Sequence, residues 1–154
     1  MSDGDAAEQA TVRWERTIPI AHHMGVQVLE VRPGFAVTQV PLAGNTNHIG
    51  TMYAGVLFTV AELLGGVIAN ATFDAERFYP IVKDLQIRFR RPATTDIRAE
   101  ALLDAAIVSA VTNTAAADGK ADFTLTATLT DATGEVVATT QGDYQSRKRP
   151  SPDA

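Results

Sequence analysis

The chain has 154 residues, of which 45% are hydrophobic and 20% charged, a composition that excludes a disordered or fibrous protein. This length predicts one domain spanning residues 1–154, with a core of its own. The formal net charge of −5 argues against nucleic acid as the main partner, and the absence of cysteine excludes disulfides, thiol nucleophiles and thiolate metal ligands.

The N-terminal end of the sequence is polar and acidic, unlike the basic start and apolar run of a secretory signal. We therefore expect a cytoplasmic protein, with flexible tails over residues 1–6 and 147–154. Between Ala7 and His22 the pattern predicts a helix whose regular part ends near Thr17, because Pro19 interrupts it.

Two strand-like segments rich in valine follow, Gly25–Val31 and Phe35–Leu42. They are separated by Arg32-Pro33-Gly34, which predicts a tight turn because proline presets φ and glycine supplies a positive φ. We expect the two segments to form a β-hairpin.

The second half of the chain alternates apolar and polar residues, as half-buried antiparallel strands do. The predicted strands are Leu85–Arg91, Ile97–Leu103, Phe123–Thr130 and Val136–Tyr144. The segment Asp104–Gly119 is rich in alanine and has a candidate N-cap and a candidate C-terminal glycine, which favour a short helix. Its valines and threonines would equally suit an extension of a strand.

The most unusual stretch runs from Gly55 to Asn70 and is apolar or small on every helical face, apart from Glu62. Such a helix is surrounded by the rest of the protein or by lipid. The charge at its middle and the strands on both sides argue against a membrane span. An antiparallel sheet has an apolar face to cover, and this helix is the only element able to cover it. We therefore expect an α+β fold, with a sheet of five to six strands wrapped around one long central helix.

A polar loop with a glycine, Asn45–Thr51, precedes this helix. The first amides of a helix lack intrahelical acceptors and favour negative charge. A carboxyl group in an apolar wall, such as that of Glu62, is expected to have a raised pKa. Loop, helix start and carboxylate together predict a reaction centre.

The run from Asn47 to Glu62, NHIGTMYAGVLFTVAE, resembles the signature of hotdog-fold acyl-CoA thioesterases of the phenylacetyl-CoA type. That signature reads Asn-x-x-Gly-Thr-x-His-Gly-Gly, followed by apolar residues and then Asp or Glu on the helix. Five residues fall on it in register: Asn47, Gly50, Thr51, Gly55 and Glu62. The resemblance covers about residues 22–146 and implies the hotdog fold.

Other features extend or depart from this pattern. The segment Asp84–Pro92, DLQIRFRRP, also resembles the family's strand that ends in an aromatic residue, Arg and Pro. Tyr53 and Ala54 stand where the family has His-Gly, and the acid is Glu62 rather than Asp. The segment 104–119 resembles an insertion into a compact member.

The resemblance implies hydrolysis of an acyl-CoA thioester, with coenzyme A as part of the substrate and with no cofactor or metal. The backbone amides of Ala54 and Gly55 are the predicted oxyanion hole, because the first turn of the helix has free donors. Glu62 would act as the base, or as a nucleophile that forms an anhydride. Asn47 would orient the water or the thioester. The predicted substrate-binding residues are His48, Thr51, Tyr53, Phe58, Arg88, Arg90 and Arg91, the three arginines meeting the coenzyme A phosphates.

Each of these roles has a simpler alternative. Glu62 would be structural or face a dimer interface, Asn47 would only hold a turn, and Arg88 and Arg90 would form a solvated sheet face. The fold also implies a homo-oligomer, a dimer or dimer of dimers joined at exposed sheet edges. Two further functions remain as alternatives: a 3-hydroxyacyl-thioester dehydratase that uses His48 and Glu62, and a non-catalytic acyl-CoA-binding protein.

Overall fold

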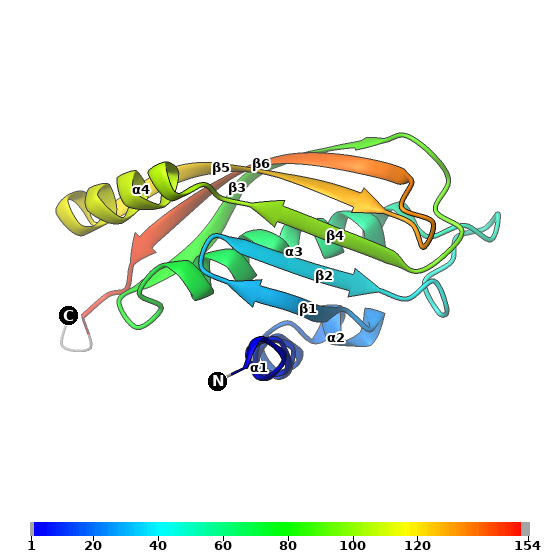
Figure 1. The fold of residues 1–154 in the computed structure, drawn as a ribbon, viewed down its shortest axis with the longest axis horizontal. Helices are drawn as coiled ribbons and strands as arrows, with labels where there is room; N and C mark the ends of the chain where they lie inside the picture. Colours follow the sequence, from blue (N-terminus) through cyan, green and yellow to red (C-terminus); the bar gives the residue numbers. More distant parts are fainter. Residues whose placement is uncertain (1, 152–154) are drawn as a thin grey trace.

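The computed structural model describes residues 2–151, apart from the side chain of Asp3. Its six strands form one antiparallel sheet in the order β1-β2-β4-β5-β6-β3, which curves around helix α3 (Figure 1). The expected α+β architecture, a sheet wrapped around one long helix, is confirmed. The helices are α1 (Asp3–Thr17), α2 (Pro19–Met24), α3 (Ala54–Thr72) and α4 (Ala105–Asp118), and the strands are β1 (Gln27–Arg32), β2 (Phe35–Val40), β3 (Phe78–Phe89), β4 (Ile97–Leu102), β5 (Lys120–Thr130) and β6 (Val136–Lys148).

Hydrogen bonds as well as apolar packing hold helix α3 against the sheet. The Thr38 hydroxyl of β2 donates to the Val60 carbonyl (3.0 Å), and the Tyr144 hydroxyl of β6 donates to the Glu62 carbonyl (3.2 Å). Farther along, the Thr72 hydroxyl accepts from the Gly34 amide at the β1–β2 turn (2.8 Å). By length and hydropathy α3 is able to cross a membrane, but 56% of its most apolar window is buried inside the fold. Its apolar character is therefore explained by the sheet that surrounds it.

The ambiguous segment 104–119 contains the predicted helix, α4. The Asp104 side chain accepts from the Ile107 amide (2.9 Å), and Gly119 ends the helix with φ +77°. Both predicted cap positions are thus confirmed.

The termini are more ordered than the sequence suggests. Helix α1 begins at Asp3 rather than Ala7, because Ser2 and Asp5 form a capping box. At the other end β6 continues to Lys148, and the Arg149 amide donates to the Arg77 carbonyl (2.8 Å). The expected tails over residues 1–6 and 147–154 are therefore too long, and Met1 and residues 152–154 lie outside the described residues.

Strand β3 also begins earlier than predicted, at Phe78 rather than Leu85. Its first half contains Pro80, and its register with β6 shifts between Val82 and Asp84, so the alternation is broken. Proline is tolerated because β3 is an edge strand that pairs only with β6.

The two edges of the sheet differ. At the β1 edge, the Thr11 hydroxyl of α1 accepts from the Val28 amide (2.9 Å), so a helix covers this edge. At the other end of the sheet, no described strand pairs with the outer edge of β3. This 12-residue edge is open to another chain.

Candidate active site

The loop before α3 is tied to the body of the protein at both ends. Asn45 is buried, and its side-chain amide donates to the carbonyls of Met24 (2.7 Å) and Pro41 (2.8 Å). At the far end, the Met52 amide donates to the Ala93 carbonyl (2.8 Å), and the Tyr53 amide donates to the Asn45 carbonyl (2.8 Å). These bonds fix where α3 begins.

The side chain of Asn47 organises the tip of this loop. Its Oδ1 accepts from the amides of Ile49 (3.0 Å) and Thr51 (3.1 Å), and its Nδ2 donates to the Thr51 hydroxyl (2.8 Å). Gly50 completes the turn with φ +83°. In this single chain, Asn47 therefore does what asparagine commonly does in loops, and Thr51 is its partner.

The first turn of α3 presents free backbone donors. Tyr53 is the N-cap residue but its side chain makes no capping bond, while its carbonyl accepts from Val56 and Leu57. Within residues 2–151, the amides of Ala54 and Gly55 have no hydrogen-bond acceptor. Two adjacent unpaired amides at the positive end of a helix form a site for a developing oxyanion.

The Tyr53 ring lies beside Gly55, next to this donor pair. A Cβ added at Gly55 would lie 2.5 Å from Cε1 of the Tyr53 ring, so the ring occupies the space next to the glycine. The Tyr53 side chain is 57% exposed and therefore free to turn away. It stands where the family pattern has His, so the contact beside the two amides differs from that pattern.

Glu62 is half-buried, two turns farther along α3. Burial raises the pKa of its carboxyl group above the ordinary value, since the charged form loses hydration. Among the described side chains, none donates a hydrogen bond to this carboxylate or pairs with it as a cation. An unpaired carboxylate with a raised pKa is suited to accept a proton near neutral pH.

Gly55 and Glu62 lie on the same open stripe of α3, with the start of the helix well before the carboxylate along its axis. Seven residues of helix correspond to a rise of about 10 Å. A reacting carbonyl needs both the oxyanion donors and the base within about 3 Å. This separation along the helix axis leads us to expect that Glu62 acts together with the first turn of another α3 helix.

Tyr144 is the residue near Glu62 that the sequence interpretation missed. Its ring is buried between Gly65 of α3 and Gly142 of its own strand, and it stacks on Phe123 with centroids 5.5 Å apart. Burial and then the nearby charge of Glu62 raise the pKa of Tyr144, which keeps the hydroxyl protonated as a donor. The signal in the sequence was Gly65, a glycine inside a helix, which indicates a close approach.

The remaining predicted residues occupy three different places. His48 is exposed in the loop, and Phe58, 38% exposed, lies on α3 one turn before Glu62. Arg88 lies on the outer face of the sheet, paired with Thr139 in register and turned away from α3. Arg90 and Arg91 follow the end of β3, and both of their amides donate to the Val137 carbonyl.

The segment containing Arg90 and Arg91 leads directly to the loop before α3, because Ala93 accepts the Met52 amide. The Arg91 guanidinium lies 3.5 Å from Glu135, and both side chains are more than half exposed. Within the described residues, no group of three His, Asp or Glu side chains is arranged to hold a metal ion.

Comparison with known proteins identifies relatives of this chain. The family model described as a domain of unknown function, DUF4442, matches residues 7–144. The chain is similar to the Pseudomonas aeruginosa protein PA5026, described as a protein of unknown function and probable thioesterase, with 46% identity over 92% of this chain and 95% of that one, and a TM-score of 0.86.

Two more distant likenesses concern the fold. The Haemophilus influenzae thioesterase HI1161 is 11% identical over 96% of this chain and 94% of that one, with a TM-score of 0.76. The Escherichia coli PaaI protein from the phenylacetic acid degradation operon is 18% identical over 97% of both chains, with a TM-score of 0.69. These similarities confirm the hotdog fold expected from the sequence.

Proposed function

The chain belongs to the family described as DUF4442 and to the hotdog-fold thioesterase superfamily, and from this membership we propose that it hydrolyses an acyl-CoA thioester to a free acid and coenzyme A. Thioester hydrolysis in general follows from its relatives. The observation that carries the finer proposal is the single open stripe of α3, which has two unpaired amides at its start and an unpaired carboxylate, Glu62, at its middle.

The proposed chemistry uses these groups in two roles. The amides of Ala54 and Gly55 stabilise the oxyanion that forms when the carbonyl carbon is attacked. The Glu62 carboxylate removes a proton from the attacking water, and that proton then passes to the leaving thiolate as the C–S bond breaks. Alternatively Glu62 attacks the carbonyl carbon itself, coenzyme A leaves, and water hydrolyses the resulting anhydride.

A second copy of the chain would bring the two roles together. If two β3 edges pair antiparallel about a two-fold axis, the two α3 helices run in opposite directions. The first turn of one helix then approaches Glu62 of the other, which removes the separation of about 10 Å present within one chain. Exposed apolar side chains on β3 and at the start of α3, Val82, Phe89 and Phe58, support this pairing. The oligomer we propose is therefore a homodimer, or a dimer of such dimers.

Coenzyme A recognition is proposed at the end of β3. Arg90 and Arg91 lie beside the loop that precedes α3, and arginine binds phosphate well. Arg88 was predicted to share this role, but its place on the outer sheet face favours the simpler alternative of a solvated residue.

The decisive experiment is release of free thiol from a panel of acyl-CoA thioesters, with a thiol-reactive dye as the reporter. The chain has no cysteine, so every thiol detected is coenzyme A. Glu62→Gln is expected to lower kcat by about 10²–10⁴-fold, the range of general base catalysis. Glu100→Gln, a similar change on the exposed face of β4, is the matched control and should keep full activity. Full activity of Glu62→Gln would exclude Glu62 from the chemistry.

Product analysis separates the alternative functions. A dehydratase would give an enoyl thioester without thiol release, and its activity would depend on His48. A binding protein would bind acyl-CoA without turnover. Thiol release that is unaffected by His48→Ala supports hydrolysis over both.

The two-chain site is tested by mixing inactive subunits. Glu62→Gln removes the carboxylate, and Gly55→Leu blocks the amides, where even a Cβ would meet Tyr53. In a mixed dimer, the amides of the first variant face the intact Glu62 of the second, so one site is complete and activity returns. If mixed subunits exchange but stay inactive, each site is formed within one chain.

A further inference from the structure

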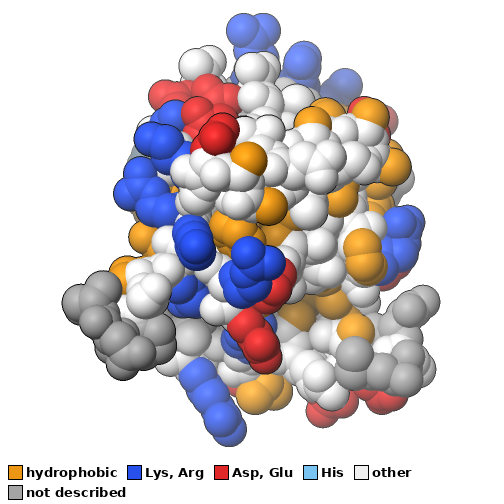
Figure 2. Space-filling view, turned by 90° about the vertical axis from the view of Figure 1, so that its left-hand side faces the viewer, with side chains coloured by type: hydrophobic (Ala, Val, Ile, Leu, Met, Phe, Trp, Pro, Cys, Tyr) orange, Lys and Arg blue, Asp and Glu red, His pale blue; other side chains and the backbone are white. Residues whose placement is uncertain are grey.

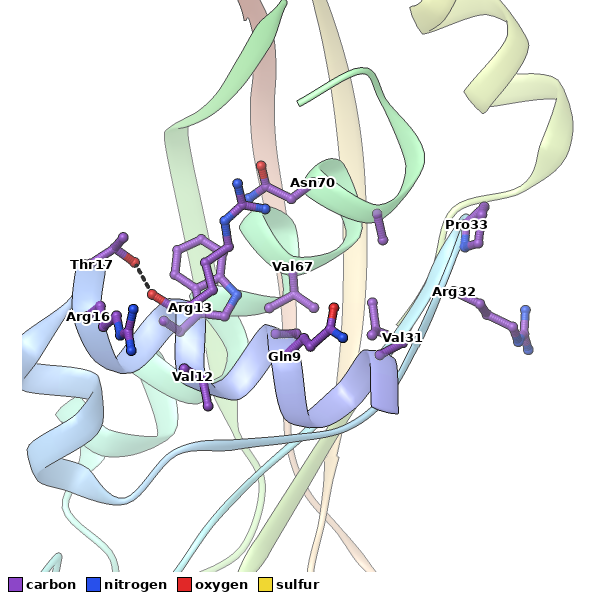
Figure 3. Close-up of a pocket in the computed structure, with 14 residues that line it drawn as sticks. Gln9, Val12, Arg13, Arg16, Thr17, Val31, Arg32, Pro33, Val67 and Asn70 are labelled. Carbon is purple, nitrogen blue, oxygen red and sulfur yellow. Dashed lines mark hydrogen bonds between the residues drawn. The ribbon is translucent and has the colours of Figure 1, made fainter. Parts of the chain in front are cut away.

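A groove lies between α1, the β1–β2 turn and the C-terminal half of α3, beyond Glu62 along that helix. Its volume is about 680 Å³, which is within the usual range for small-molecule sites. Figure 3 shows α1 crossing in front of α3, with the side chains of both helices lining the space between them. The lining residues are Ala6, Gln9, Ala10, Val12, Arg13, Trp14, Arg16, Thr17, Val31, Arg32, Pro33, Val67, Asn70 and Ala71.

The floor of the groove is apolar, and its two valines belong to the packed core. Val31 and Val67 are both more than nine-tenths buried, so core packing holds their side chains in place. The Trp14 ring packs on Gly66, where an added Cβ would lie 2.8 Å from Cη2. A hydrocarbon chain on this floor would lose contact with water at little cost to the protein.

The rim of the groove is basic. Its lining contains Arg13, Arg16 and Arg32 but no Asp or Glu, in a chain whose net charge is −5. Arg32 is engaged elsewhere, 3.6 Å from Glu30 and over the Phe35 ring, and Figure 3 shows it pointing away from the space. The ion pairs among the described side chains do not include Arg13 or Arg16.

Arg13 stands at the centre of this arrangement. Its side chain extends over the groove toward Asn70, with Arg16 one turn farther along α1 (Figure 3). Asn70 donates its side-chain amide to the Gly66 carbonyl (2.9 Å), which leaves its oxygen beside the groove. Figure 2 shows the wider setting, an end of the molecule where exposed apolar atoms lie among basic and acidic side chains.

We propose that this groove binds an aliphatic monocarboxylate. Arg13 would hold the carboxylate, because the guanidinium fork matches its two oxygens, and Arg16 would add positive charge one turn farther along α1. The hydrocarbon chain would lie on Val31, Val67 and Trp14. An inorganic anion would use the arginines but leave this floor in water, and a neutral lipid would leave the arginines unpaired. Binding here involves different residues from thioester hydrolysis and does not depend on it.

Trp14 is the only tryptophan of the chain and lines the groove, so its fluorescence reports directly on binding. Decanoate, titrated below its micelle-forming concentration, is expected to change this fluorescence saturably. Decanol, with the same chain length and no charge, should bind at least about tenfold more weakly, because it cannot form charge-assisted hydrogen bonds. Equal binding of decanoate and decanol would overturn the carboxylate assignment.

Three variants locate the site. The double change Arg13→Gln and Arg16→Gln should weaken decanoate binding at least about tenfold. Ala10→Leu should also weaken it, because the added carbons enter the groove from α1 while the helix keeps a strong helix former. Arg98→Gln, on β4, removes an exposed arginine elsewhere and should leave binding unchanged.

Sedimentation velocity of the same variants tests the other occupant, a second copy of the chain. If decanoate does not bind and the double arginine change alters the oligomeric state, the groove is an interface between copies and the assignment is wrong. Unchanged decanoate binding by both groove variants would equally refute it. None of these measurements uses a thioester, so their outcome is independent of whether the protein is a hydrolase.

Discussion

At Gly65, helix α3 lies directly against a side chain of the sheet, and Gly65→Ala is expected to destabilise the protein. An added Cβ would collide with the ring of Tyr144. That ring is 2% exposed, stacks on Phe123 and lies against Gly142, so it has no free space to enter. The helix or the strand would have to move instead.

The size of the effect follows from two opposed terms. Alanine gains up to about 1 kcal/mol of helix propensity over glycine, whereas overpacking a rigid core site costs about 1–3 kcal/mol, occasionally more. At the upper end of this range, the net loss of about 2 kcal/mol lowers Tm by about 4–8 °C for a chain of this size. Because Glu62 lies one turn before Gly65, thioester hydrolysis should fall as well.

The neighbouring residue provides the matched control for thermal unfolding followed by circular dichroism. Gly66→Ala makes the same chemical change in the same helix but meets the end of the half-buried Trp14 side chain, on α1, at 2.8 Å. Trp14 can shift, so Gly66→Ala should be neutral or mildly stabilising. If Gly65→Ala is as stable as Gly66→Ala, the packing account of Tyr144 is refuted.

Three other outcomes are expected. Burial raises the pKa of Glu62, so hydrolysis should be lost as pH falls through a value above the ordinary 4.5, and a pH–rate profile with its acid limb at or below 4.5 would contradict this. For the same reason, ionised Glu62 lowers the stability of the folded protein at neutral pH, so Glu62→Gln should raise Tm there. This gain in Tm should disappear as pH falls below 4.5, where Glu62 is protonated in both the folded and the unfolded state. A gain that persists at acid pH would point to another cause. Arg90→Gln should raise KM for acyl-CoA with little change in kcat, whereas Arg88→Gln, on the outer sheet face, should leave both constants unchanged, and the reverse pattern would exchange their roles.

Much of the fold was predictable because its local signals agree with one another. The strict alternation of β4 and β5 set their inner and outer faces, and Asp104 and Gly119 marked both ends of α4. The prediction was least accurate at β3, where Pro80 and a register shift interrupt the period. An edge strand tolerates such features because only one of its sides must pair.

The N-terminal boundary was wrong for a different reason. The capping box formed by Ser2 and Asp5 is a clear local signal, but the residues inside it, Asp3, Gly4 and Asp5, are weak helix formers. What holds this turn is tertiary packing, since Ala7 is buried in the main core. Contacts of this kind cannot be inferred from the propensities of a short polar segment.

The candidate site shows the limit of periodicity as evidence for function. A spacing of seven residues correctly placed Gly55 and Glu62 on one stripe of α3. The same spacing separates them by about 10 Å along the axis, so a shared face does not make a shared site. In the dimer proposed above, a second chain paired at the open edge of β3 would reverse α3 and set its first turn against Glu62.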